Sequence, residues 1–147
     1  MYAQIDQFPV DKALNTIVEE GIAPVYIRAY YLAQGKKVWK VEKNMADLQG
    51  SRAYDLIDGM GVTWEVKADR LWHVTGNVYI EIQALEASQA EKYLILAGKG
   101  YVVAKLALTE AISQGYDLTP GGDNLRSLGV KLPLEKLEEI SEEVIVL

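Results

Sequence analysis

The sequence predicts an α/β protein in which helices flank a mixed central sheet. Apolar residues recur at helical spacing near the N-terminus, and several later segments alternate apolar and polar residues as half-buried strands do. An order of helix first, then strands mixed with further helices, is typical of this class. The 147 residues fit one domain, which we expect to span 1–147.

The predicted helices begin and end at recognisable residues. Apolar spacing predicts a first helix over 10–20, which Gly21 interrupts. Pro24 suits the first turn of a second helix that stops at Gly35. This second helix is apolar on several sides, so we expect it to be largely buried. Three further helices are predicted over 86–97, 109–114 and 133–142.

The predicted strands share either a two-residue alternation or a short apolar run. They are expected over 36–42, 53–57, 62–68, 78–84 and 101–106, and 144–147 is either a short edge strand or a frayed end. Between 53–57 and 62–68 lies Asp58-Gly59-Met60-Gly61, which favours a tight hairpin turn. The hairpin carries the most informative residues of the chain.

Composition excludes several classes of site. The chain has no cysteine, which rules out disulfides, zinc thiolate sites and thiol catalysis. Its single histidine, His73, rules out histidine-rich metal sites. The N-terminus lacks a basic region followed by an apolar run, and no apolar stretch has membrane-spanning length. We therefore expect a cytoplasmic protein with no membrane partner.

The charge distribution leaves nucleic-acid binding open. A net charge of −6 argues against a polyanionic partner. Residues 21–75, however, carry eight basic and six acidic side chains, whereas the last fifteen positions hold five acids. A mildly basic middle is consistent with a binding face, and equally with a mixed solvated surface.

Three charged residues of the hairpin have the pattern of a metal-dependent hydrolytic site. In a strand, alternate side chains share a face, so Glu65 and Lys67 point the same way, with Trp64 on the other side. The hairpin turn brings Asp55 beside Glu65. Two carboxylates with backbone and water oxygens suit Mg²⁺ or Mn²⁺, and an adjacent lysine suits orientation of an attacking water.

This arrangement resembles the PD-(D/E)xK nucleases. An acid at a strand start, a short turn and then Glu65-Val66-Lys67 in an apolar strand form the superfamily's core pattern, although the proline before Asp55 is absent. The following segment, 75–83, resembles a strand of small phage-encoded nucleases of this class. The similarity spans about 19–137, but only Asp55, Glu65 and Lys67 form a motif.

The resemblance implies a restriction-endonuclease-like fold and a magnesium-dependent endonuclease that cleaves DNA. Asp55 and Glu65 would bind Mg²⁺ (or Mn²⁺), and Lys67 would assist the attacking water. A glutamate on a helix before the sheet often joins such sites, and Glu20, or Glu19, is the candidate. Small nucleases of this type often dimerise, which makes a homodimer through the apolar second helix an expectation.

Other residues have weaker claims to the site. Asp58 is an alternative metal acid, but the pair Asp58-Gly59 is more typical of a turn. His73 is a candidate for contact with the scissile phosphate, but a bystander role is favoured, and Glu81 either flanks the metal or belongs to a polar strand face. The candidate substrate-binding residues are Arg70, Thr75, Asn77 and Gln83.

Two rival functions remain open at this point. In the first, the nuclease-like fold is catalytically silent and binds nucleic acid or a protein, which the acidic composition favours. In the second, the chain is an unrelated α/β interaction domain, with Glu65 and Lys67 as surface residues. Loss of metal binding with an intact fold distinguishes the first from an active nuclease.

Overall fold

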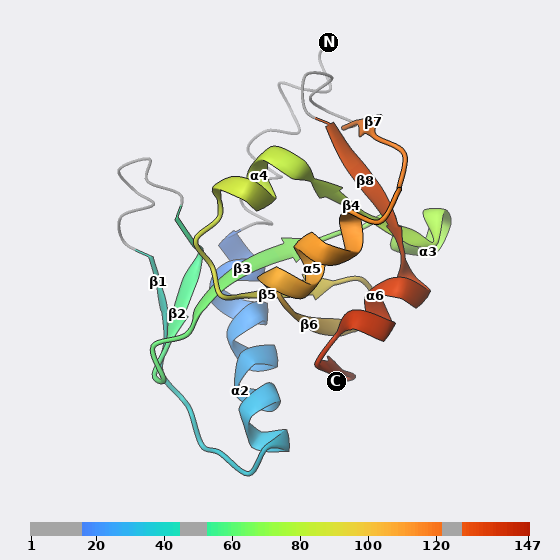
Figure 1. The fold of residues 1–147 in the computed structure, drawn as a ribbon. Helices are drawn as coiled ribbons and strands as arrows, with labels where there is room; N and C mark the ends of the chain where they lie inside the picture. The colour runs from blue at the N-terminus through green and yellow to red at the C-terminus, as the bar shows by residue number, and fades with distance from the viewer. Residues whose placement is uncertain (1–15, 45–52, 122–127) are drawn as a thin grey trace, which may run out of the picture.

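The computed structural model describes residues 16–44, 53–121 and 128–147. These residues form a mixed α/β fold with two sheets (Figure 1). The larger sheet has six strands in the order β1-β2-β3-β5-β6-β9, and the smaller has three in the order β4-β8-β7. The mixed central sheet flanked by helices is confirmed, whereas the second sheet was not predicted.

The elements have the following bounds. The strands are β1 Val41–Lys43, β2 Leu56–Asp58, β3 Thr63–Ala68, β4 Asn77–Glu81, β5 Lys92–Leu96, β6 Gly100–Ala104, β7 Thr119–Pro120, β8 Leu128–Pro133 and β9 Glu143–Ile145. The helices are the π-helical η1 Val18–Ile22, then α2 Ala23–Ala33, α3 Trp72–Thr75, α4 Ile82–Ala87, α5 Lys105–Ile112 and α6 Leu134–Ile140.

The first described helical segment continues through Gly21, so the predicted break there is wrong. Pro24 has no N–H with which to continue the α-helical hydrogen-bond ladder. The chain instead widens into η1, where the N–H of Ala23 bonds to the carbonyl of Val18. The helix α2 ends just before Gly35, whose φ of 76° is left-handed, as predicted. Positions 10–15 of the predicted first helix lie outside the described residues.

The central hairpin forms as predicted. β2 and β3 are antiparallel, with Leu56 opposite Trp64 and Ile57 opposite Thr63. The predicted strand over 36–42 is shorter and shifted, because only β1 pairs with β2. β9 lies at the edge of the large sheet beside β6, as expected for the chain end.

The predicted helix over 86–97 is wrong, because its second half is the buried strand β5. β5 lies parallel to β3 and antiparallel to β6. Tyr93, Leu94 and Ile95 are all buried, since this strand is covered on both faces. A continuous apolar run does not distinguish a helix from such a strand by its period. The crossover from β3 to β5 contains α3, β4 and α4.

The boundaries of two further elements differ from prediction. The predicted strand over 78–84 ends at Glu81, where α4 begins. The predicted helix over 109–114 begins earlier, at Lys105, and the hydroxyl of Thr109 bonds back to the carbonyl of Lys105 instead of capping an N-terminus. The helix predicted over 133–142 is confirmed as α6.

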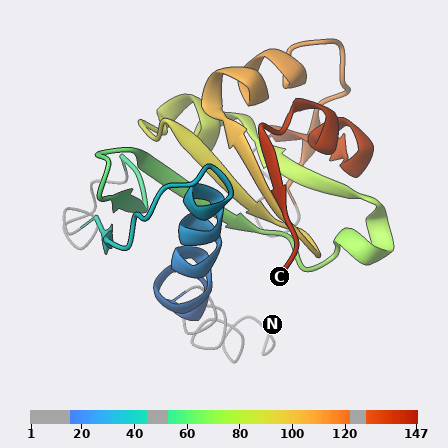
Figure 2. The same cartoon turned by 90° about the horizontal axis from the view of Figure 1, so that it is seen from below.

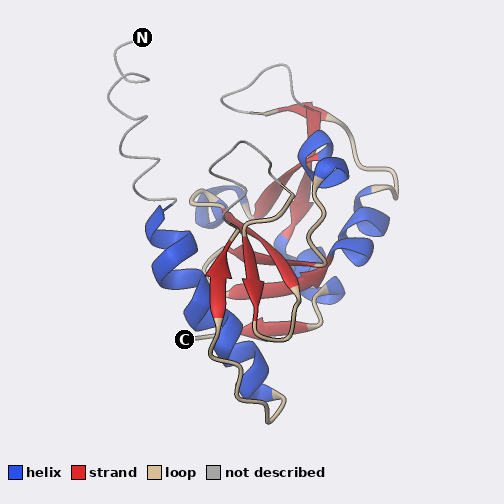
Figure 3. Ribbon diagram, turned by 90° about the vertical axis from the view of Figure 1, so that its left-hand side faces the viewer, coloured by secondary structure: helices blue, strands red, loops and turns tan. Residues whose placement is uncertain are grey.

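The large sheet is covered on both faces. Ala23, Ile27, Tyr30 and Tyr31 of α2 pack against Trp64 and its neighbours on one face. The second sheet and the helices α5 and α6 cover the other face (Figure 2; Figure 3). α2 is only half buried, because Val25 and Leu32 on its outer side are exposed.

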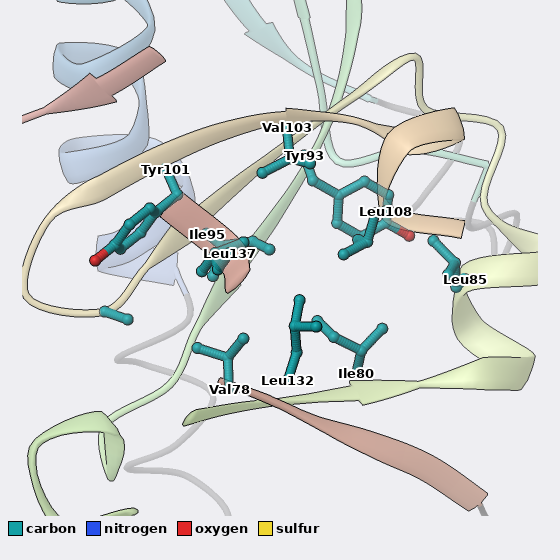
Figure 4. Packing of buried hydrophobic residues seen from close by; sticks show 11 residues of the cluster. Val78, Ile80, Leu85, Tyr93, Ile95, Tyr101, Val103, Leu108, Leu132 and Leu137 are labelled. Atoms are coloured by element: carbon teal, nitrogen blue, oxygen red, sulfur yellow. The ribbon is translucent and has the colours of Figure 1, made fainter. Parts of the chain in front are cut away.

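The layer between the two sheets is the larger of two apolar clusters. Figure 4 shows Val78, Ile80 and Leu132 of the small sheet facing Ile95, Tyr101 and Val103 of the large one. Among the described residues, none of the helices combines the length and apolarity needed to cross a membrane.

Candidate functional site

Glu65 and Lys67 face the space between the two sheets. β3 is in parallel register with β5, so that Glu65 lies beside Tyr93 and Lys67 beside Ile95. Tyr93 and Ile95 belong to the cluster between the sheets, whereas Trp64 packs toward α2. The alternation of β3 therefore places the glutamate and the lysine on one face, as predicted.

A cavity of about 320 Å³ opens in front of these two side chains. β3 supplies one wall, the end of β4 and the helix α4 supply the opposite wall, and Tyr93 of β5 lies at its base. Figure 4 shows the Tyr93 ring extending from the large sheet toward Leu85 of α4, with Ile80 on β4 nearby. The cavity forms because β4 and α4 leave the plane of the large sheet within the β3–β5 crossover.

Asp55 is held against the same part of β3. Its N–H donates to the carbonyl of Trp64 (2.9 Å), and its Oδ2 accepts from the N–H of Val66 (2.8 Å). The register of the hairpin, with Leu56 opposite Trp64, places Asp55 across from Glu65. The second contact fixes this carboxylate beside Val66, which lines the cavity, whereas Asp55 itself is not among the lining residues.

Ser88, which the sequence did not suggest, orients Glu65. Its hydroxyl donates to Glu65 Oε1 (2.9 Å) and accepts from the N–H of Ala90 (3.2 Å). Its carbonyl accepts a hydrogen bond from the Lys105 side chain. Ser88 fell inside the predicted helix over 86–97, where its role in the β3–β5 crossover carries no local signal.

Lys67 is a cation in an acidic setting. Burial lowers the pKa of Lys67, while the charges of Asp69, Glu81 and Glu65 act in the opposite direction. Loss of hydration outweighs the attraction of the three carboxylates. Its amine is therefore easier to deprotonate than an exposed lysine.

Burial and the negative charges of Glu65 and Asp55 all raise the pKa of the Tyr93 hydroxyl. Burial raises the pKa of Tyr93 to about 12, a hydrogen bond with Ser88 opposes that change, and the charges of Glu65 and Asp55 add to it. Both carboxylates are therefore close enough to Tyr93 to disfavour a phenolate there. Tyr93 is a second site residue that the sequence did not suggest, because it was assigned to a helix.

Glu20 does not line the cavity. Its carboxylate lies 3.8 Å from Lys43 Nζ, at the start of the helix that packs on the opposite face of the large sheet. Glu19 contacts the same lysine at 3.8 Å. The described contacts of both glutamates thus link η1 to β1.

Asp58 is a structural residue, as its turn position suggested. It is buried, and its carboxylate accepts hydrogen bonds from the hydroxyl of Tyr31 (2.5 Å) and from Trp64 Nε1 (2.7 Å). The N–H groups of Met60 and Val62 bond to its other oxygen, which closes the hairpin turn. Of these four donors, the Tyr31 hydroxyl joins the hairpin to α2, and the other three lie within the hairpin.

The four predicted substrate-binding residues lie apart from the cavity wall. Gln83 lay within the predicted strand over 78–84, but β4 ends at Glu81 and Gln83 is exposed on α4. Thr75 and Asn77 hydrogen-bond to each other in the turn after α3. Arg70 is exposed beyond the end of β3.

Glu81 lines the cavity, whereas His73 does not. Glu81, for which the sequence left two roles open, lines the cavity opposite β3. His73 is exposed on α3 and contacts the Trp72 ring edge-on, which agrees with a bystander.

The oxygen atoms at Asp55 and Glu65 suit a hard cation. Magnesium commonly binds through one or two carboxylates and keeps several waters, and these two carboxylates lie at facing positions of the hairpin. Across the described parts of the chain, no group of three or more His, Cys, Asp or Glu side chains has the geometry to hold a metal. Any cation here would therefore rely on waters or substrate oxygens for much of its coordination.

Comparison with protein-family models, curated proteins and solved structures finds no match to this chain. The geometry of the cavity and its residues is thus the basis for assigning a function.

Proposed function

We propose that this chain is a metal-dependent endonuclease of the PD-(D/E)xK type, with a restriction-endonuclease-like fold, that hydrolyses DNA phosphodiester bonds. One observation carries the proposal: Glu65 and Lys67 share a cavity wall, and Asp55 is anchored across the hairpin from Glu65. Two neighbouring carboxylates, with an amine on the same cavity wall as one of them, suit hydrolysis of a phosphate ester.

Asp55 and Glu65 are the residues that would hold Mg²⁺ or Mn²⁺. A bound cation supplies Lewis-acid chemistry, neutralising phosphate charge and making water a better nucleophile near neutral pH. Ser88 restricts Glu65 to one orientation through its hydroxyl. The backbone of Val66 does the same for Asp55.

Lys67 and Tyr93 supply the remaining polar groups of the site. The Lys67 amine orients the attacking water and balances charge on the phosphate. Because its pKa is lowered, it also releases a proton more easily than an exposed lysine does. Tyr93, with its pKa raised to about 12, keeps its proton at neutral pH and serves as a hydrogen-bond donor.

Cleavage of a mixed substrate panel tests the proposal. The panel contains linear duplex, single strand, four-way junction and supercoiled plasmid, each with Mg²⁺ or Mn²⁺ and with EDTA. The wild type is compared with Lys67→Ala, and with Lys99→Ala as a control on an exposed lysine outside the cavity lining. We expect metal-dependent cleavage that Lys67→Ala abolishes and Lys99→Ala leaves unchanged.

The second candidate is a catalytically silent module that binds nucleic acid or a protein. The net charge of −6 and the lack of a three-residue metal cluster among the described positions favour it. A folded protein that binds divalent cation but cuts no substrate would support this candidate over the nuclease. A folded protein that binds neither divalent cation nor nucleic acid would contradict both the nuclease and the silent module that binds nucleic acid.

A further inference from the structure

The cavity restricts how a nucleic acid reaches Glu65 and Lys67. These side chains face an interval between two sheets, and the opposite wall is the end of β4 with α4. Its volume of about 320 Å³ lies at the small end of the range for pockets that hold small ligands. A duplex keeps its bases stacked inside and presents its backbone on a broad convex surface. That surface is too wide to enter this cavity.

Much of the cavity lining is apolar. Ala84 and Ala87 are the exposed apolar residues of the lining, whereas Ile80, Leu85 and the Tyr93 ring are buried. Aromatic and apolar side chains bind an unstacked base without regard to its sequence, because every base has an apolar face. The polar side of the same cavity holds Glu65, Lys67 and Glu81. The lining thus has one side for a base and one side for a phosphate.

The wall opposite β3 lacks positive charge. The sequence from Leu71 through Glu91, which includes β4 and α4, contains no lysine or arginine. Among the described residues that line the cavity, Lys67 is the one cation. Tight binding to a duplex normally requires several phosphate contacts from basic side chains, which this wall cannot provide.

We propose that the cavity receives one unpaired nucleotide, so that the substrate is single-stranded DNA or the frayed end of a duplex. The base lies against the exposed apolar lining at Ala84 and Ala87, and the adjacent phosphate lies toward Lys67 and Glu65. This inference rests on the proposed function, since it names the substrate class of the same site. Enzymes that take a base into a pocket favour nucleotides that are already unpaired, because these lose the least stacking and pairing energy on entry.

Filling the cavity tests the inference. Ala84→Phe adds a ring at an exposed position on α4 that lines the cavity. Ala33→Phe, at the exposed end of α2, is the matched control on the other side of the large sheet. Cleavage and fluorescence-anisotropy binding are measured on one end-labelled oligonucleotide, single-stranded or in a blunt duplex, with Mg²⁺. Circular dichroism verifies folding of each variant.

We expect the single strand to be cut at least about tenfold faster than the duplex, because the duplex must first unpair. Ala84→Phe should remove most of that activity, and Ala33→Phe should retain it. Equal or faster cutting of the duplex, or full activity in folded Ala84→Phe, would overturn the inference and leave the nuclease proposal standing. If no substrate is cut, the nuclease proposal fails and the binding data decide: preference for the single strand that Ala84→Phe removes supports the inference, and any other result overturns it.

Discussion

The hydroxyl of Ser88 lies 2.9 Å from Glu65 Oε1 and donates a hydrogen bond to it. This contact joins the end of the β3–β5 crossover to the strand that carries Glu65 and Lys67. Ser88 is buried, so water does not readily replace the lost donor in a variant. The orientation of Glu65 therefore depends on a residue outside the predicted motif.

Ser88→Ala should weaken binding of Mn²⁺ by about tenfold, as loss of an orienting partner to a metal ligand typically does. Calorimetric titration of Mn²⁺ measures the change. Ser113→Ala removes an exposed hydroxyl that bonds only locally, to the carbonyl of Glu110, and should leave Mn²⁺ affinity unchanged. Equal affinities in the wild type and Ser88→Ala would show that this hydrogen bond does not position Glu65.

Substitution of Asp58 should lower stability, whereas substitution of Asp55 should lower activity. Asp58→Ala leaves Tyr31 and Trp64 with buried donors unpaired, so the free energy of unfolding should fall by about 3 kcal/mol. Asp55→Asn keeps an oxygen for the N–H of Val66, and should lose metal-dependent activity with little loss of stability. Urea unfolding and a cleavage assay on both variants test the two roles. Activity surviving in Asp55→Asn would contradict its assignment.

Local pattern predicted the part of the site that lies on the hairpin. The turn at Asp58-Gly59 and the alternation of β3 determine where Glu65 and Lys67 point, and both signals lie within adjacent residues. Ser88 and Tyr93 come from the far end of a crossover, and Tyr93 lies in a buried apolar run whose period is ambiguous. Their proximity to Glu65 depends on the parallel pairing of β3 with β5, which no local pattern specifies.

The continuity of the helix through Gly21 and the face on which it packs also depend on contacts distant in sequence. The continuity of η1 and α2 past Gly21 depends on how Pro24 and the packing of α2 on the large sheet balance each other. The nuclease resemblance made Glu20 a candidate because it lies on a helix before the sheet, but that helix packs on the face opposite Glu65. Sequence order alone does not indicate the face.

Gly100 should not tolerate a side chain. A Cβ atom there would lie 2.3 Å from Cδ1 of the Tyr26 ring. Gly100→Ala should reduce the free energy of unfolding by about 1–3 kcal/mol, as overpacking does. Gly21→Ala is the control: no heavy atom lies within 4 Å, and alanine in a helix should stabilise by about 0.5–1 kcal/mol. Thermal unfolding of both variants measures the difference, and similar melting temperatures would contradict the packing.

Because the pKa of Lys67 is lowered, the free energy of unfolding should rise with pH over a defined range. Between that lowered value and the ordinary 10.5, the unfolded chain binds more protons at this residue than the folded chain, so folding becomes more favourable as pH rises. Lys67→Met lacks this contribution. Urea unfolding of both proteins from pH 7 to pH 10.5 should show the wild type gaining stability relative to Lys67→Met. The same tyrosines titrate in both chains, so a constant difference would contradict the lowered pKa.

Binding of single-stranded DNA should depend only weakly on salt. Each neutralised phosphate contributes a slope of about −0.7 to the plot of log K against log salt concentration for single strands. With Lys67 as the one cation among the described lining residues, we expect a slope of about −1. Anisotropy titrations over a range of potassium chloride concentrations measure it, with Lys99→Ala as a control. A slope of about −4 or steeper would mean that an extended basic surface binds the strand.

A calorimetric titration of Mn²⁺ into the wild type, Asp55→Asn and Glu65→Gln, with circular dichroism on each, measures whether the two carboxylates hold a cation. If Asp55 and Glu65 hold one cation beside Lys67, the wild type should bind Mn²⁺ at one site, and each folded variant should lose that binding. Absence of binding in the wild type, or equal binding in all three proteins, would contradict the claim.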